Sequence, residues 1–388
     1  MRVVIAPQGF KGTLSGMAAA EAMRSGMLRA LPNASTELVP MADGGHGTLD
    51  ALLDAAGGER CWLDVTGPVG ETVHAAWGTI PGGDRAGNGK SSAVVEIAQA
   101  SGLTLIPEAK RDPLLTTTYG AGQLLAAALE SGHRLIIVGV GGSATSDGGA
   151  GAARALGIRL TDADGRAIGF GASGLLTLAH ASLDGRHARL AGAELVVATD
   201  VSNPLTGPNG AAFTYGPQKG AAPDVLPVLE AALSRLADVV LRDLGVELRG
   251  IAGMGAAGGL AAGLVAFAGA RLVWGAEVVA DAVGLDGHLA GADLVITGEG
   301  RIDWQTVFHK APIEVAKRAS ARDIPVLGVG GSLGPGAADV LANGMTLIEG
   351  TSVPNGPMPS DTDAQALLAD ATERAIRRWL GGQTIGGT

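Results

Sequence analysis

The chain has 388 residues, which is enough for two to three domains of about 150 residues each. Lysine and arginine number 28 against 38 acidic residues, and the formal net charge of −10, without any basic run, argues against nucleic acid as a partner. The single cysteine, Cys61, excludes an internal disulfide, and Pro7 interrupts the start before a signal-peptide core can form, so we expect a cytoplasmic location.

The first sixty residues predict alternating strands and helices. Residues 3–6 are a continuous apolar run typical of a buried parallel strand, and Ser15 is placed to cap a helix that runs to Leu31. A second strand is expected over 37–41 and a short helix follows through Leu52 and Leu53. This βαβα pattern is typical of a parallel sheet with helices on its faces.

From residue 63 the pattern changes, because residues 63–66 and 72–80 flank a Gly-Pro turn and predict an antiparallel hairpin. The same region predicts helices over 122–131 and 223–244 and strands over 135–138 and 195–198. We therefore place a domain boundary here.

The strand and helix alternation resumes near residue 294 and predicts that the chain returns to its opening sheet. Strands are expected over 294–297, 326–329 and 347–348, and helices over 312–321 and 363–380. The predicted domains are residues 1–62 plus 288–388, which form one discontinuous domain, and residues 63–287, which are inserted into it. Residues 82–92 and 381–388 are expected to be exposed segments with little to bury.

Residues 250–270 carry no charge and are long enough to cross a membrane. Glycines at 255, 259 and 263 even have the spacing of a membrane helix dimer. Because glycine and alanine dominate the stretch, its insertion drive is weak, and we expect a Gly-rich loop followed by a helix over 256–268 in a protein core. No membrane partner is predicted.

Two glycine motifs resemble phosphate-binding sequences. Gly89-Lys90-Ser91 ends like a P-loop, but the spacing from Gly83 is wrong and a strand follows instead of a helix. Residues 139–144 match the dinucleotide fingerprint G-x-G-x-x-A directly after a strand. The motif continues to Asp147, a carboxylate that fits a helix cap, a metal or phosphate role, or a nicotinamide site.

Several loops share one composition of glycine, carboxylate and a hydroxyl, amide or lysine, and each follows a predicted strand. They cover residues 8–13, 43–48, 200–210, 216–220 and 298–303. Ligands of open α/β sheets bind beyond the carboxyl ends of the strands, so these loops are expected to line one crevice. Cationic Lys11 and Lys219 beside several carboxylates suit a nucleotide bound with Mg²⁺.

Over nearly its whole length the chain resembles the glycerate kinase type 1 family. The matching stretches are 5–7 with 10–12, 40–45 with 47–48, 65–68, 113–120, 141–151, 203–211, 216–220, 297–301 with 303, 305–306 and 310–312. The resemblance implies ATP-dependent phosphorylation of D-glycerate on its 2-hydroxyl. It also implies two α/β domains, a discontinuous flavodoxin-like (Rossmann-like) domain and an inserted mixed α/β domain resembling the restriction-endonuclease fold.

Five positions depart from the family pattern. Gln8, His46 and Ser202 each stand where a carboxylate is usual, Trp304 replaces a small residue and His309 replaces glycine. These departures leave open a paralogue that acts on another small hydroxy acid or has lost activity. A nicotinamide-dependent oxidoreductase and a non-catalytic sugar-acid sensor are alternatives from other classes.

On the kinase interpretation the charged loop residues take distinct roles. Asp200 is predicted to orient or deprotonate the substrate hydroxyl, with Asp147 as the competing candidate, and Lys219 and Lys11 to face phosphate or the substrate carboxylate. Glu299 and Asp303 are predicted to hold Mg²⁺. Nucleotide contacts are expected from Gly141, Gly142, Ser143, Asp43, Gly44, Gly45 and Asn203. The oligomeric state is left open, with a homodimer as one candidate.

Overall fold

The computed structural model describes residues 1–10, 13–45, 47–81, 91–351 and 361–383. These residues form two compact units. Unit 1 consists of residues 1–43, 50–57 and 275 onward, and unit 2 consists of residues 44–49 and 58–274.

Unit 1 is built on a five-stranded parallel sheet. Its strands are β1 (Arg2–Ile5), β2 (Ser35–Leu38), β11 (Leu294–Glu299), β12 (Val326–Gly330) and β13 (Leu347–Gly350). The spatial order is β13-β12-β11-β1-β2, and every neighbouring pair is parallel. Numbered along unit 1 alone, this is the order 2-1-3-4-5 of flavodoxin-like sheets, as predicted.

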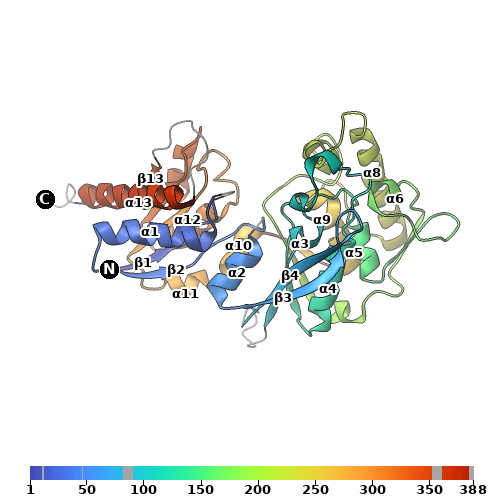
Figure 1. The fold of residues 1–388 in the computed structure, drawn as a ribbon, viewed down its shortest axis with the longest axis horizontal. Coiled ribbons are helices and arrows are strands. Elements are labelled where there is room, and N and C mark those ends of the chain that lie inside the picture. Colours follow the sequence, from blue (N-terminus) through green and yellow to red (C-terminus); the bar gives the residue numbers. More distant parts are fainter. Residues whose placement is uncertain (11–12, 46, 82–90, 352–360, 384–388) are drawn as a thin grey trace. The chain divides into compact units, whose positions relative to one another are not determined.

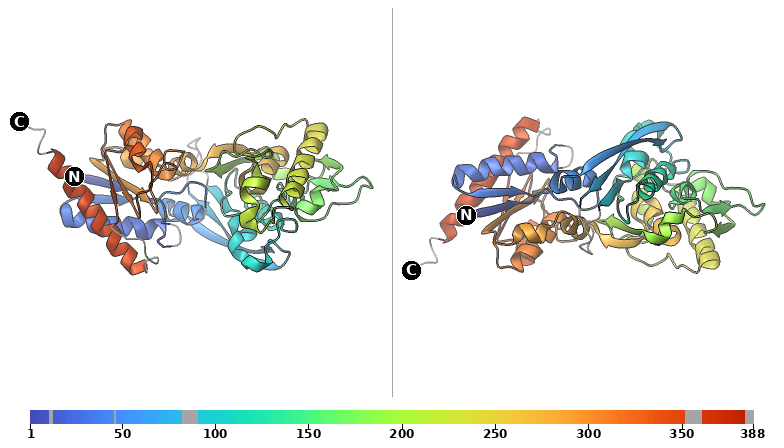
Figure 2. Two further views of the ribbon diagram at one scale, coloured as in Figure 1. Left: turned by 90° about the horizontal axis from the view of Figure 1, so that it is seen from above. Right: turned by 90° about the horizontal axis from the view of Figure 1, so that it is seen from below.

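Helices cover both faces of this sheet. Helices α1 (Gly16–Ala30) and α13 (Asp361–Gln383) lie side by side on one face, and α12 (Ala311–Ser320) lies on the other, with α10 (Gly275–Ala282) and α11 (Leu285–Leu289) beside it (Figures 1 and 2). Ser15 caps α1 as predicted, because its hydroxyl accepts the N–H of Ala18. Gly26 allows the close approach of α13, since a Cβ there would lie 1.9 Å from a carbonyl oxygen of that helix.

Unit 2 has a six-stranded mixed sheet in the order β10-β9-β6-β5-β4-β3. The predicted hairpin is confirmed, with β3 (Glu59–Thr66) antiparallel to β4 (Thr72–Ile80). The parallel part consists of β5 (Ser92–Glu96), β6 (Leu135–Gly139), β9 (Glu194–Thr199) and β10 (Arg271–Trp274). A separate two-stranded antiparallel sheet pairs β7 (Arg159–Thr161) with β8 (His180–Ser182).

The helices of unit 2 surround one apolar core that includes residues of β5, β6 and β9. They are α3 (Ala98–Ser101), α4 (Tyr119–Glu130), α5 (Ala150–Ala155), α6 (Gly171–Leu175), α7 (Ala211–Tyr215), α8 (Leu226–Leu244) and α9 (Leu260–Ala268), and α2 (Thr48–Ala56) begins in this unit and continues into unit 1. Short 3₁₀ turns lie between these elements: η1 (Leu103–Leu105), η2 (Glu108–Lys110), η3 (Ala188–Gly192), η4 (Pro217–Lys219) and η5 (Ala256–Gly259). A further turn, η6 (Ala337–Asn343), lies in unit 1.

The unit bounds differ from the expected domain ranges at both ends of the insertion. Residues 58–62 belong to unit 2 because β3 begins at Glu59, and residues 275–287 belong to unit 1. We propose that the two units are the two domains of the chain, with these ranges.

The two segments expected to be exposed each contribute residues to regular structure. Ser92 is the first residue of β5 and is buried, and α13 continues to residue 383. Residues 82–90 and 384–388, with Gly83, Gly89 and Lys90 of the P-loop comparison, lie outside the described residues.

Residues 250–270 contain the predicted Gly-rich loop and buried helix, but the α-helix, α9, begins at Leu260 and not at residue 256, because the left-handed backbone of the turn η5 precedes it. Within the described ranges no helix is both long and apolar enough to cross a membrane. Ala257, Gly258 and Gly259 are three successive residues with left-handed backbone, at φ of 53°, 66° and 89°. A Cβ on Gly258 would lie 2.0 Å from the carbonyl oxygen of Thr145, so this position packs directly on the loop that precedes Asp147.

Substitution of this glycine should cost far more stability than substitution of a glycine with similar backbone in open space. Gly258→Ala adds a steric clash with Thr145 to left-handed strain, and we expect a loss of at least about 3 kcal/mol in the free energy of unfolding. Gly245→Ala has φ of 70° with nothing near its Cβ, so strain alone should cost about 1 kcal/mol. Urea unfolding of both variants measures the difference; equal losses would contradict the packing argument.

Candidate active site

The sheet order of unit 1 defines where a ligand is expected. In doubly wound sheets ligands bind beyond the strand carboxyl ends at the point where the strand order reverses. Here that point lies between β1 and β11. Hydrogen bonds join the end of β11 to the residues that follow β1. The Thr297 hydroxyl donates to the Ala6 carbonyl at 2.7 Å, and the Gln8 N–H donates to the Gly298 carbonyl at 2.8 Å.

A group of charged and polar side chains lies at this place, which we call the switch-point cluster: Asp43, Glu299, Asp303, Thr306 and Lys310. The Thr306 hydroxyl donates to Glu299 Oε1 at 2.7 Å and accepts the Asp303 N–H at 3.0 Å. Lys310 Nζ lies 3.7 Å from Asp43 Oδ2. The structure thus brings together three of the carboxylates predicted to bind a magnesium nucleotide.

Glu299 is the last residue of β11 and is buried. Burial raises the pKa of its carboxyl from 4.5 to about 7, and the charges of Asp43 and Asp303 add to the rise. The Thr306 hydrogen bond and the Lys310 charge act in the opposite direction. A cation bound to Glu299 would favour the ionised form, so this carboxyl is placed to respond to a metal ion.

The chemistry of this cluster fits Mg²⁺ bound together with a phosphate ligand. In the part of the chain that the structure describes, no group of three or more His, Cys, Asp or Glu could hold a metal ion alone. Mg²⁺ commonly uses one or two carboxylates and takes its other ligands from water and substrate phosphates. Gln8, in the loop after β1, also has a buried Oε1 without a hydrogen-bond partner among the described residues.

Trp304 and His309, two departures from the family pattern, lie beside this cluster. The Trp304 ring meets the Phe308 ring edge to face, with ring centres 6.0 Å apart, and the two residues are 52% and 58% exposed. His309 has φ of 56°, a left-handed conformation that favours glycine, which explains why glycine is usual at this position.

In unit 2, Asp147 is fully buried and acts as an acceptor for several backbone and side-chain groups. Its carboxylate accepts the N–H groups of Thr118, Gly149 and Gly151 and the Thr118 hydroxyl, at 2.9–3.1 Å. Burial nevertheless raises its pKa. With both oxygens occupied at the start of α5, the geometry favours the capping interpretation of Asp147.

Lys219 is also buried, and its Nζ donates to the Thr145 carbonyl at 2.5 Å. Burial lowers the pKa of this amine from 10.5 to about 7, while the charge of Asp147 acts to raise it. The residue stands on the turn η4, which ends at Gly220 with φ of 95°. The charged form of an amine with so little solvation is stable only when an anionic group lies close to it.

Asp200 follows β9 directly, and its charge contributes to raising the pKa of Tyr215 to about 12, after burial as the main cause. The Tyr215 hydroxyl donates to Asn203 Oδ1 at 2.7 Å, and Asn203 Nδ2 donates to the Asn209 carbonyl at 2.8 Å. Asn203 therefore ties the loop after β9 to α7. Tyr215, whose ring centre is 6.0 Å from Lys219 Nζ, was missed from the sequence, although the chain has only two tyrosines.

The glycine loops predicted to contact nucleotide meet within unit 2. The Gly141 N–H donates to the Gly44 carbonyl at 3.2 Å, and the Gly45 carbonyl accepts the Thr48 hydroxyl. Gly142, with φ of 71°, and Ser143, which is buried, follow in the same loop. Because no helix begins until Ala150, the loop lacks the helix start that the dinucleotide fingerprint requires.

Glu96 is a further buried carboxylate that sequence reasoning missed. It is the last residue of β5, and it accepts the N–H groups of Gly47 and Leu49, both at 3.2 Å. Its position at a strand end is the same signal that singled out Glu299. Lys11 and His46, both named from the sequence, lie outside the described residues.

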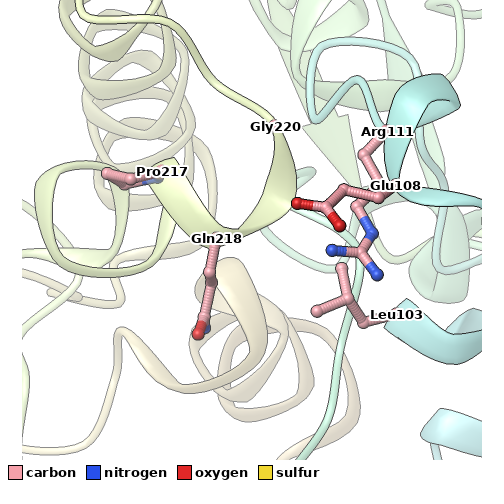
Figure 3. Close-up of a pocket in the computed structure, with 6 residues that line it drawn as sticks. All are labelled: Leu103, Glu108, Arg111, Pro217, Gln218 and Gly220. Atoms are coloured by element: carbon pink, nitrogen blue, oxygen red, sulfur yellow. The ribbon is translucent and has the colours of Figure 1, made fainter.

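A cavity of about 270 Å³ lies in unit 2 beside the Lys219 turn (Figure 3). Its lining residues are Leu103, Glu108, Arg111, Pro217, Gln218 and Gly220. Arg111 was not predicted, although it directly precedes the Asp112-Pro113 turn at the start of a family-like stretch.

The fold and these side chains define an α/β enzyme of two units with acidic and cationic groups at strand ends. The profile of the glycerate kinase family matches residues 3–380. The chain is 45% identical over 377 residues to a Bacillus subtilis protein named glycerate kinase, covering 97% of this chain and 96% of the relative. It is 47% identical over 333 residues to an Escherichia coli protein named glycerate 2-kinase, covering 86% of each.

A crystal structure from Salmonella typhimurium LT2 that carries a glycerate kinase 2 assignment aligns with a TM-score of 0.85. That chain is 42% identical, and the alignment covers 99% of both chains. The chain therefore belongs to the glycerate kinase family.

The low pKa of Lys219 predicts a specific pH dependence of stability. Between pH 7 and 10.5 the unfolded chain binds a proton at this amine and the folded chain does not, so the contribution of Lys219 to stability rises with pH across this window. The variant Lys219→Met removes this pH-dependent contribution to stability. We expect the variant to exceed the wild type in unfolding free energy by a few kcal/mol more at pH 6.5 than at pH 9.5, since one pKa unit is about 1.4 kcal/mol. Denaturant titrations at both pH values that show a constant difference would contradict the burial argument.

Proposed function

We propose that this protein transfers the γ-phosphoryl group of ATP to the 2-hydroxyl of D-glycerate. The observation that carries the proposal is the family match over residues 3–380, together with 47% identity to a protein named glycerate 2-kinase. The acceptor is a small molecule, and a cytoplasmic location and a homodimer stay predictions of the sequence.

Unit 1 supports the nucleotide half of this proposal. Glu299 and Asp303 would hold Mg²⁺ at the carboxyl end of β11, and Lys310 and Asp43 lie in the same cluster. When bound, Mg²⁺ neutralises charge on the phosphate oxygens. Thr306 keeps Glu299 and Asp303 in fixed relation, because its hydroxyl bonds to both residues.

Unit 2 supports the acceptor half. We assign the base to Asp200 rather than Asp147, because the oxygens of Asp147 already accept four donor groups whereas Asp200 is only partly buried at a strand end. Lys219 supplies positive charge for the phosphoryl group, and an approaching phosphate would raise the pKa of its amine and favour the charged form. The nucleotide contacts of Gly44, Gly45, Gly141, Gly142, Ser143 and Asn203 stay predictions; in the structure the Gly141 N–H and the Asn203 side chain already have protein partners.

The alternatives from other classes are not favoured. The oxidoreductase reading rested on residues 139–144, and that loop does not open a helix. The hypothesis of a sensor, and the separate hypothesis of a paralogue with another substrate, rested on the carboxylates absent at Gln8, His46 and Ser202. Those losses leave the carboxylates of the switch-point cluster in place.

ADP formation from ATP and Mg²⁺ with D-glycerate tests the proposal. L-glycerate, glycolate and tartronate serve as competing acceptors, and ³¹P NMR of the product distinguishes 2-phosphoglycerate from 3-phosphoglycerate. We expect turnover with D-glycerate and the 2-phosphate product. No ADP above the ATPase background with D-glycerate, or turnover only with another acid, would contradict it.

Loss of the buried amine should reduce turnover strongly. Lys219→Met keeps the volume but removes the charge, and we expect kcat to fall by about 10²- to 10³-fold, the usual cost of losing a preorganised charge contact. Lys110→Met, an exposed lysine of the same unit, is the control and should retain near wild-type turnover. A folded Lys219→Met enzyme with unchanged kcat would remove Lys219 from the scheme.

Loss of the Glu299 carboxylate should change the metal requirement. Glu299→Gln is expected to raise the Mg²⁺ concentration for half-maximal rate by about tenfold or more, because a hard anionic ligand is lost. Asp339→Asn removes an exposed carboxylate of the same unit and should leave this concentration unchanged. Initial rates over a Mg²⁺ series at saturating ATP give both values, and equal shifts in the two variants would argue against a metal at Glu299.

A further inference from the structure

We propose that the cavity beside the Lys219 turn binds the acceptor, with Arg111 pairing with its carboxylate and Glu108 with a hydroxyl. This inference rests on the proposed function and adds the residues that recognise the acid. It concerns unit 2 alone, since all six lining residues belong to that unit.

The cavity has two walls of different origin. Leu103 of η1, Glu108 of η2 and Arg111 form one wall, and residues of η4 and its end, including Gln218, form the other (Figure 3). Figure 3 shows the charged ends of Glu108 and Arg111 close together on the side facing Gln218. A cation and an anion therefore line one wall of the cavity, and Gln218 lines the other.

Arg111 is the strongest indication of a ligand. Its side chain is half-buried, and Nε is buried without a hydrogen-bond partner among the described residues. A buried guanidinium N–H that lacks an acceptor is costly, so the described protein groups do not fully satisfy this side chain. Because Nε itself is covered by protein, a ligand in the cavity would bind the terminal nitrogens of the guanidinium. Glu108, although in the same wall, does not satisfy this donor.

The backbone connects Arg111 to Lys219. Gly220 packs on the Arg111 carbonyl so closely that a Cβ would lie 2.4 Å from that oxygen. Gly220 also has φ of 95°, so glycine is required on both grounds. The residue proposed to hold the carboxylate and the turn that carries the proposed phosphoryl-facing lysine thus form one rigid contact.

The lining chemistry favours a hydroxylated monocarboxylic acid. A guanidinium matches a carboxylate with two parallel hydrogen bonds, which no other side chain does as well. The Glu108 carboxylate accepts from a hydroxyl and repels a second carboxylate. The cavity should therefore prefer D-glycerate over a dicarboxylate such as tartronate.

Steady-state kinetics of Arg111→Gln tests the assignment. We expect the KM for D-glycerate to rise by about 10- to 100-fold, the usual cost of losing a charged hydrogen-bond pair, while the KM for ATP stays within about twofold. Arg111→Lys should recover part of the loss. Lys110→Gln removes an exposed positive charge from the neighbouring position and should leave both values unchanged.

A second variant tests the other half of the recognition. Glu108→Gln removes the repulsion, so inhibition by tartronate should strengthen at least fivefold relative to the KM for D-glycerate. This measurement decides the proposal if Arg111→Gln does not fold.

The outcomes separate this inference from the proposed function. Wild-type turnover with D-glycerate combined with an unchanged KM in Arg111→Gln, or an equal rise in Lys110→Gln, overturns the inference and leaves the kinase assignment standing. Absence of wild-type turnover overturns the kinase assignment. In that case calorimetric binding of D-glycerate to the wild type but not to Arg111→Gln supports the site, and no binding to either overturns it.

Discussion

The buried carboxylate of Asp147 is the constraint on which the candidate site of unit 2 depends. An anion removed from water is stable only if its oxygens find donors, and here they find the backbone of two loops and the Thr118 hydroxyl. The Thr118 hydroxyl in turn accepts the Ala152 N–H at 2.9 Å. One carboxylate therefore fixes the start of α5, the segment before α4 and the electrostatic surroundings of Lys219.

Unit 1 also contains a buried carboxylate, Glu299, but its surroundings differ. Glu299 accepts one hydroxyl donor among the described residues, and burial raises its pKa as it does that of Asp147. Asp147 is satisfied by the protein, whereas Glu299 has one hydroxyl donor and the Gln8 Oε1 has no partner among the described residues, which supports the proposal that this place binds a ligand. Both carboxylates are buried, and the number of donors is what distinguishes them among the described residues.

Much of the fold could be predicted because its strands are continuous apolar runs and its caps and turns have strong local signals, such as Ser15 and the Gly67-Pro68 turn. The strand β10 was missed because Arg271–Trp274 is short and only half-buried at a sheet edge. The sequence singled out candidate site residues where a carboxylate follows a predicted strand, as with Glu299 and Asp200, and their roles stay predictions. Arg111 and Tyr215 were not singled out because Arg111 lines a cavity and the Tyr215 ring lies beside a buried amine, and no local sequence pattern encodes either arrangement.

The discontinuity of unit 1 has a consequence for how the chain folds during synthesis. β1 pairs with both β2 and β11, and the residues of β11 emerge almost three hundred positions later. At about 5–20 residues per second the ribosome needs some tens of seconds to supply that partner. Throughout this interval β1, an interior strand of the parallel sheet, has one unpaired edge, while nearly all of unit 2, as one continuous stretch, is already available to fold. Nascent chains halted before residue 294 should therefore need chaperone protection at their amino-terminal strand.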